Sequence, residues 1–229
     1  MDEYFEIITG EYIFDCIIEK NEEFIEIYFG NTKMRRHSCI YILIEKGNNI
    51  ATLESLRYGS NCELNGKLES EIGTILMLKT ALKFVFDKYK FLKAIDYYDK
   101  AQKDRINIIP KNLLLGIEPW YVKHFGAKPN DASTRNIINE IKKINITSED
   151  LKEISKRTWG TDEDIDKFCN KYNLPFLIGT YWIISKLNIM TYDIFYEIRK
   201  IQKGGGKIKE KLRKILRKAE RSYYSTMHL

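Results

Sequence analysis

A glycine near the middle of the chain precedes an amphipathic helix, and this arrangement could bind a phosphate group. Gly73 lies in the segment 69–77, and residues 79–89 carry the helical pattern. The first backbone N–H groups of a helix have no acceptor within the helix and lie at the positive end of its dipole, so they attract anions. The segment is a candidate phosphate site, with a plain turn before a helix as the alternative.

Short strands must position this segment. Four runs rich in β-branched and aromatic residues precede it, at residues 11–18, 24–29, 39–44 and 50–56, and turn residues separate them. After the helix, residues 91–97 have the composition of a strand, and a short helix that begins near Pro119 ends at Gly126. Together they predict an α+β sandwich in which a cofactor could enter beside the first helix.

At these residues the chain resembles the GNAT acetyltransferase superfamily, and within it the GNAT-like proteins of large DNA viruses. The matching residues are Leu56-Arg57-Tyr58, Asn61-Cys62-Glu63-Leu64, Gly73-Thr74 with Met77-Leu78-Lys79-Thr80-Ala81-Leu82, and Trp120-Tyr121 with His124-Phe125-Gly126-Ala127. The resemblance covers residues 1–130 and implies a mixed, mainly antiparallel sheet flanked by helices. It also implies an N-acetyltransferase that uses acetyl-CoA and transfers its acyl group to an amine.

The resemblance assigns roles to particular residues. In this family a loop that contains glycine holds the pyrophosphate of acetyl-CoA, and the corresponding residues here are Ile72, Gly73, Thr74 and Ile75. A later tyrosine often protonates the departing thiolate, and Tyr121 corresponds to it.

Acyl transfer to an amine also needs a base that accepts the proton of the amine. Glu54 and Glu63 lie on or near the strand that enters the loop, so each is a candidate base, either directly or through water. Each of these catalytic residues has an ordinary alternative. A Glu on an alternating strand usually faces solvent, and an amphipathic tyrosine usually packs its ring and exposes its hydroxyl.

The loop departs from the pattern of the family, and this favours a second function. The family has Gln or Arg, then Gly, then Gly or Ala at positions where this chain has Ser70, Gly73 and Ile75. Glu69 and Glu71 also place negative charge near the expected diphosphate. The alternative to the enzyme is therefore a noncatalytic GNAT-fold protein with a structural or assembly role in a virus.

Composition favours a folded protein in the cytoplasm or, for a viral protein, in the virion. The chain has 229 residues, of which 44% are hydrophobic and 13% aromatic, enough to form one good core or two modest ones. No apolar run approaches the roughly 18 residues of a membrane helix, and the acidic start lacks the pattern of a secretory signal. Cys16, Cys39, Cys62 and Cys169 have no metal-ligand or disulfide spacing, so we expect reduced thiols and no metal site.

From residue 131 onward the pattern predicts helices. Polar capping residues with acidic or polar first turns begin helices at residues 131–133, 147–150 and 161–164, Pro175 begins a fourth, and residues 191–193 begin a fifth. Apolar residues surround the fourth helix over 176–184, which is typical of the buried centre of a bundle. We therefore predict an all-α domain over 131–203, after the GNAT-like domain over 1–130.

Positive charge is concentrated near the C-terminal end of the sequence. Residues 199–221 contain eleven Lys or Arg and two Glu, and the glycines at 204–206 separate a final segment, 204–229, whose helix spans 207–221. A basic helix of this kind suits nucleic acid, an anionic membrane surface or an acidic protein, and a solvated helix is the alternative. The candidate contact residues are Lys207, Lys209, Lys211, Arg213, Lys214, Arg217, Lys218 and Arg221.

Overall fold

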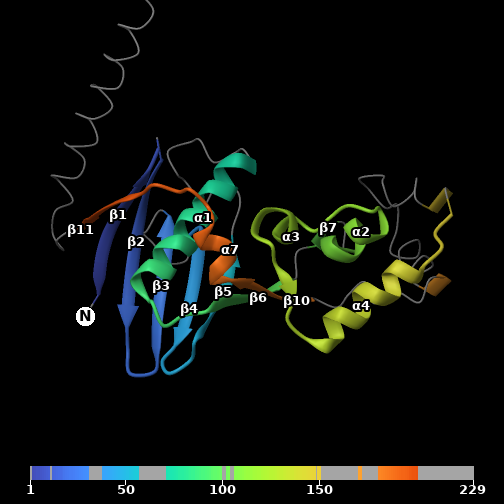
Figure 1. Cartoon of the computed structure of the whole chain (residues 1–229), viewed down its shortest axis with the longest axis horizontal. Coiled ribbons are helices and arrows are strands. Elements are labelled where there is room, and N and C mark those ends of the chain that lie inside the picture. Colours follow the sequence, from blue (N-terminus) through green and yellow to red (C-terminus); the bar gives the residue numbers. More distant parts are fainter. Residues whose placement is uncertain are drawn as a thin grey trace, which may run out of the picture.

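The computed structural model describes residues 2–10, 12–30, 38–56, 71–99, 102–103, 106–147, 149–150, 170–171 and 180–200. The fold is mixed α+β (Figure 1), and its main sheet has nine strands that are mostly antiparallel. In order across the sheet, the strands are β11 (Glu197–Lys200), β1 (Glu3–Thr9), β2 (Tyr12–Lys20), β3 (Phe24–Gly30), β4 (Ile40–Glu45), β5 (Ile50–Leu56), β6 (Ala94–Asp99), β10 (Thr180–Ser185) and β9 (Lys128–Pro129). The described helices are α1 (Glu71–Lys88), α2 (Ile108–Leu114), α3 (Trp120–Phe125), α4 (Ala132–Lys143) and α7 (Lys186–Met190), and β7 (Gln102–Lys103) pairs with β8 (Ile106–Asn107).

Strands β1 to β5 form an antiparallel meander. Successive side chains of a strand point to opposite faces, so every second residue reaches the core. Phe5, Cys16, Phe29 and Ile40 form one such row across four strands, and all four are buried. The four strands predicted upstream of the helix are confirmed as β2 to β5, and β1 is a further strand that the sequence analysis did not predict.

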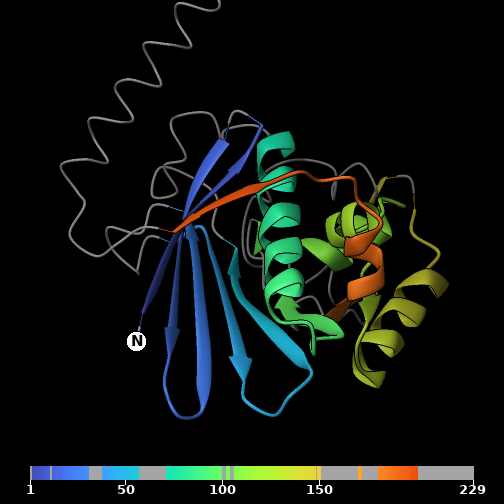
Figure 2. The same ribbon diagram turned by 60° about the vertical axis from the view of Figure 1, so that its left-hand side comes forward.

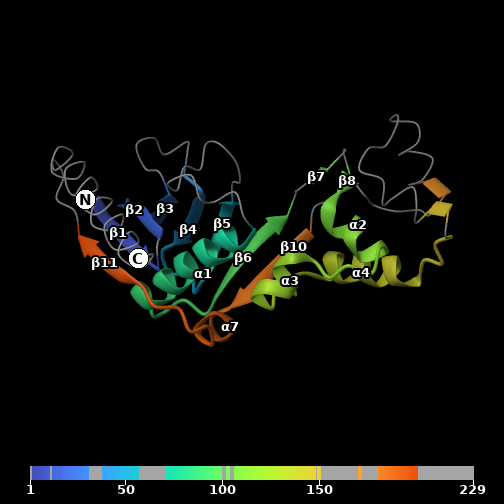
Figure 3. The same ribbon diagram turned by 90° about the horizontal axis from the view of Figure 1, so that it is seen from above.

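The helix α1 connects β5 to β6, and these two strands are parallel. A parallel pair needs a crossover connection, and Figure 2 shows α1 lying along one face of the sheet. Leu78, Leu82, Val85 and Phe86 of α1 are completely buried and belong to one core with the strands. Helices α3 and α7 lie on the same side of the sheet as α1 (Figure 3).

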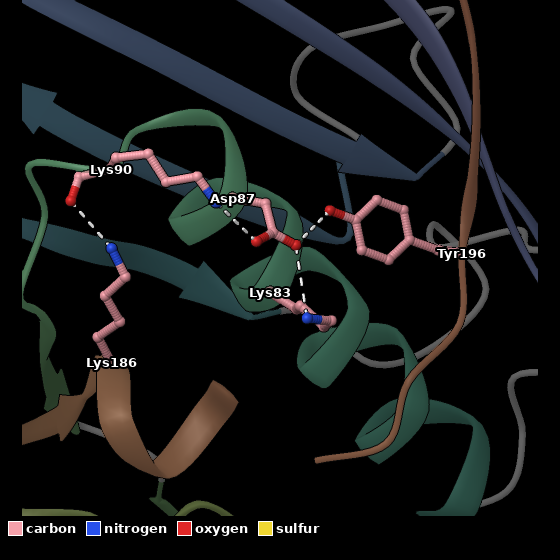
Figure 4. A network of polar contacts seen from close by, with 5 residues as sticks. All are labelled: Lys83, Asp87, Lys90, Lys186 and Tyr196. Atoms are coloured by element: carbon pink, nitrogen blue, oxygen red, sulfur yellow. Dashed lines mark hydrogen bonds and ion pairs between the residues drawn. The ribbon is translucent and has the colours of Figure 1, made fainter. Parts of the chain in front are cut away.

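A polar network anchors the C-terminal end of α1 (Figure 4). Asp87 accepts a hydrogen bond of 2.7 Å from the Tyr196 hydroxyl and forms ion pairs with Lys90 at 3.1 Å and Lys83 at 3.5 Å. Lys186, the first residue of α7, donates to the backbone carbonyl of Lys90 at 2.9 Å. The segment between α7 and β11 is thereby attached to α1 before β11 pairs with β1.

The late strands correct the prediction for residues 131–203. β10 lies between β6 and β9, antiparallel to both, and β11 pairs with β1 at the other edge of the sheet. The predictions of a helix through residue 184 and of a helix from residue 191 are therefore wrong. In β10, buried Trp182 and Ile184 alternate with Tyr181, which is 48% exposed, because only one face of the strand packs in the core. The described part of residues 131–203 is therefore not all helical, since β10 and β11 belong to the main sheet.

Two other predicted helices are confirmed. The helix α3 ends at Gly126, which has the left-handed φ of 61° and donates its N–H to the carbonyl of Val122 at 2.9 Å. The helix α4 follows Asp131, whose carboxylate accepts from the N–H of Thr134 at 2.6 Å. The helix predicted from residue 161 and the basic segment 204–229 lie outside the described residues, as does most of the helix predicted from residue 147.

Cys39 is disulfide-bonded, so the prediction that all four thiols are reduced is wrong for this residue. Its partner lies outside the described residues, whereas Cys16 is free and buried. Sequence spacing could not reveal the bond, because disulfide connectivity is decided by the fold. The absence of a side chain at Gly30 leaves space for Cys39, since a Cβ on Gly30 would lie 2.5 Å from the Cys39 sulfur.

Among the helices that the structure describes, none combines the length and the apolar character needed to cross a lipid bilayer.

Candidate functional site

The parallel strands β5 and β6 separate after a short ladder. Ile50, Ala51 and Thr52 pair with Ala94, Ile95 and Asp96, in that order. Beyond these residues β5 continues beside β4, and β6 continues beside β10. The C-terminal ends of both strands therefore lie at one edge of the sheet with an opening between them.

A β-bulge at Glu54 accompanies this separation. Tyr41 of β4 pairs with Ser55, whereas the next residue, Ile42, pairs with Leu53. Glu54 is thus the extra residue on β5. A bulge bends its strand and increases the local twist, and this one lies just after Thr52, where the pairing of β5 with β6 ends. Glu54 is exposed at the opening that results.

The opening is a cleft of about 290 Å³. Its lining residues are Leu53, Glu54, Ser55 and Leu56 of β5, Tyr97, Tyr98 and Asp99 of β6, and Tyr121 of α3. Two predicted catalytic residues, Glu54 and Tyr121, therefore line the same cleft. The third, Glu63, lies outside the described residues.

Tyr121 is held firmly by aromatic neighbours. Its ring centroid lies 4.2 Å from that of Tyr97, and the ring of Trp120 packs edge-on at 4.9 Å. Burial, and then the negative charge of Asp99, raise the pKa of the Tyr121 hydroxyl. The hydroxyl is therefore neutral at physiological pH and can donate a proton or a hydrogen bond.

Tyr97 is a residue that the sequence analysis missed. It is 4% exposed, and its hydroxyl has no hydrogen-bond partner within the part of the chain that the structure describes. Burial, followed by Tyr121 and Asp99, raises the pKa of this hydroxyl. No sequence signal could have found it, because an aromatic residue in a strand is ordinarily a core residue.

An acidic, tyrosine-rich surface adjoins Glu54 on the face of the sheet opposite α1. The rings of Tyr28 and Tyr41 stack at 4.8 Å, and their hydroxyls donate to Glu26 at 3.0 and 2.9 Å. Burial and then Glu26 raise the pKa of Tyr28 to about 12. They raise the pKa of Tyr41 as well, and Glu54 contributes to that shift. This surface favours a positively charged ligand.

The residues predicted to bind phosphate, Ile72, Gly73, Thr74 and Ile75, lie in the first turn of α1. The prediction that Gly73 lies in a turn is wrong, because the helix already includes Glu71. Gly73 and Thr74 are themselves buried. These four residues do not line the cleft described above. However, α1 is the crossover that follows β5, so its first turn lies at the edge of the sheet where the cleft opens.

In the described ranges, no group of three or more His, Cys, Asp and Glu side chains could hold a metal ion. No family model, curated protein or solved structure matches this chain. The geometry of the cleft is therefore the basis for assigning a function.

Proposed function

We propose that this protein is an acetyl-CoA-dependent N-acetyltransferase with a GNAT-like fold. The observation that supports it is the cleft between the parallel strands β5 and β6, which both Glu54 and Tyr121 line. Amine acylation needs a base for the amine and an acid for the departing thiolate, and these two side chains supply one of each.

The shape of the cleft suits an extended ligand. Beyond Thr52 and Asp96 the facing edges of β5 and β6 are not paired with each other, so a ligand could bind there as an added strand does. The pantetheine arm of CoA is extended and carries amide groups that match such edges. A volume of about 290 Å³ is close to the lower limit of ligand pockets, which hold roughly 300–1,000 Å³. The cleft therefore suits the arm rather than the nucleotide.

In this proposal the diphosphate binds at the first turn of α1, beside Gly73. The positive end of a helix dipole attracts anions, and ligands of sheets with parallel strands bind beyond the carboxyl ends of those strands. The arm and the diphosphate would then contact consecutive parts of the unit formed by β5 and α1.

The chemistry assigned to the two side chains is a balanced acyl transfer. The amine nitrogen forms a bond to the thioester carbonyl carbon, and Glu54 takes the proton that the amine loses. The carbon–sulfur bond then breaks, and the thiolate takes the hydroxyl proton of Tyr121. Exchange with solvent restores both side chains. The raised pKa of Tyr121 keeps the hydroxyl protonated before the reaction, but it also makes the hydroxyl a weaker acid toward the thiolate than an unshifted tyrosine.

The test is a titration of the full chain with acetyl-CoA, followed by calorimetry and by thermal unfolding. Binding should release or absorb heat and should raise the unfolding temperature, because a ligand that binds only the folded state stabilises it. Absence of both effects at millimolar acetyl-CoA would exclude the enzyme.

Variants then separate catalysis from binding. With a panel of amines that includes a polyamine, an amino sugar and a lysine peptide, release of CoA thiol should fall roughly 10²- to 10⁴-fold in Tyr121→Phe. Glu54→Gln should lower the rate with little change in acetyl-CoA affinity. The control is Glu45→Gln, because Glu45 is exposed at the end of β4 and does not line the cleft. Equal losses in Glu54→Gln and Glu45→Gln would remove Glu54 from the mechanism.

The second candidate is a noncatalytic GNAT-fold protein that assembles with other components of a virus. It is favoured by the fact that the four predicted cofactor residues, 72–75, do not line the cleft. The same titration separates the two candidates. Binding of nucleic acid or an acidic protein by residues 207–221 is a further proposal, which deletion of residues 207–229 tests through the loss of salt-sensitive binding.

A further inference from the structure

We propose that the Tyr97 hydroxyl is a second hydrogen-bond donor of the cleft and binds the thioester carbonyl oxygen of acetyl-CoA. This inference rests on the proposed function, and it separates the work of the two tyrosines. Tyr97 would bind the carbonyl oxygen, whereas Tyr121 would serve the sulfur.

The first support is the missing partner of a buried polar atom. Tyr97 is 4% exposed and lines the cleft, yet its hydroxyl has no hydrogen-bond partner among the described residues. Buried polar groups in folded proteins are nearly always hydrogen-bonded, so an exception on a residue that lines a cleft is consistent with a partner supplied by a ligand. A carbonyl oxygen is an acceptor, and the hydroxyl has a hydrogen to donate.

The second support is the position of Tyr97 in the sheet. It directly follows Asp96, the last residue of β6 that pairs with β5, so it stands where the two strands begin to separate. On its other side it pairs with Trp182 of β10, which is 2% exposed. The strand fixes the ring, but the hydroxyl oxygen is itself buried, so neighbouring side chains must move for a ligand in the cleft to reach it.

The third support is the contact with Tyr121. The two ring centroids are 4.2 Å apart, with an angle of 36° between the ring planes. This packing restricts both rings and places two phenol side chains at one cleft. Burial is the largest cause that raises the pKa of each hydroxyl, so both hydroxyls are neutral. Neutral phenols can donate hydrogen bonds at every pH at which the protein would work.

The experiment compares acetyl-CoA with CoA, because the acyl group is the only difference between them. Calorimetry gives the dissociation constant of each for the wild type, for Tyr97→Phe and for a matched control, Tyr89→Phe. Tyr89 is 8% exposed, its hydroxyl has no partner among the described residues, and it does not line the cleft. Both variants therefore delete an unpartnered buried hydroxyl, but only one deletes it at the ligand.

We expect Tyr97→Phe to bind acetyl-CoA roughly tenfold more weakly and CoA as well as the wild type does. Tyr89→Phe should bind both ligands normally. Neither variant should lower the unfolding temperature, since each removes a hydroxyl that has no partner. As a second measurement on the wild type alone, the infrared carbonyl band of bound ¹³C-labelled acetyl-CoA should shift to lower frequency than in solution.

The other outcomes overturn the inference in distinguishable ways. If Tyr97→Phe keeps the wild-type affinity for both ligands, or loses affinity equally for both, Tyr97 does not contact the carbonyl, although the acetyltransferase proposal stands. An unshifted carbonyl band in the wild type has the same meaning. If the wild type binds neither ligand, the proposed function fails and this inference fails with it.

Discussion

Replacing Tyr196 by phenylalanine should test how the chain after α7 is attached to α1. The hydroxyl of Tyr196 donates to the Asp87 carboxylate at 2.7 Å, and its ring packs edge-on against Phe84 with centroids 6.3 Å apart. The substitution keeps the ring and removes only the hydrogen bond. Hydrogen bonds to charged groups contribute about 1.5–3 kcal/mol, and a half-buried pair belongs at the lower end, so we expect a loss of about 1.5 kcal/mol.

The loss should depend on pH in a definite direction. Burial is the largest influence on the pKa of Asp87 and raises it, but hydrogen bonds from Tyr196 and Lys90 and the charges of Lys83 and Lys90 together hold that pKa below its usual value. A lowered folded-state pKa gives stability that is complete above the unfolded pKa, about 3.9, and is lost as the pH falls through the folded value. The deficit of Tyr196→Phe should thus be full at pH 7 and should shrink below about pH 4.

Urea unfolding followed by circular dichroism measures this deficit, and thermal unfolding should show a decrease of about 3–6 °C in Tm at pH 7. A double-mutant cycle with Asp87→Asn isolates the pair, because Asp87→Asn alone also weakens the contacts with both lysines. The reasoning is refuted if Tyr196→Phe unfolds like the wild type at pH 7. It is equally refuted if the cycle gives no coupling between the two residues.

Two further substitutions test the frame of the sheet. Gly30→Ala should destabilise the protein by about 2–4 kcal/mol, because Gly30 has a φ of +115° and a Cβ there would lie 2.5 Å from the Cys39 sulfur. Urea unfolding measures this loss, and a loss below about 1 kcal/mol would contradict the geometry. Glu3→Gln should cost about 1 kcal/mol at pH 7, because Glu3 pairs with Lys88 at 2.9 Å and also with Lys20. Burial alone would raise the pKa of Glu3, but the two lysines hold it below the usual value, so the cost should diminish as the pH falls below about 4; a deficit that grows in acid would contradict the assignment.

Strands β2 to β5 are predictable from the sequence because each is a short run of β-branched and aromatic residues between turn signals. The helix α3 is predictable from the glycine that ends it, and α4 from the aspartate that begins it. β1 is harder, since Glu3 and Glu6 interrupt its apolar pattern. β10 has no local signal that separates it from a buried helix, because a short apolar run fits both, and only the pairing with β6 decides.

In the candidate site, too, some residues can be predicted from local sequence, whereas others depend on how the strands pair and pack. Glu54 and Tyr121 can be chosen from the sequence by residue type and by resemblance, but the bulge that exposes Glu54 depends on the register between β4 and β5. Tyr97 cannot be chosen at all, because its interest lies in a hydroxyl without a partner, which is a property of the packed structure. Gly73 shows the opposite error, since a local turn signal was outweighed by the helix that continues through it.

β10 and β11 come late in the sequence, and this has a consequence for synthesis on the ribosome. When residues 1–99 have been made, β1 and β6 are both outer strands, each with a row of unsatisfied amides, because the segments that cover them are residues 197–200 and 180–185. Exposed strand edges invite pairing with other chains, and contacts between distant parts of a chain form slowly. The unpaired edges of β1 and β6 are therefore exposed to pairing with other chains until residues 180–200 have been translated.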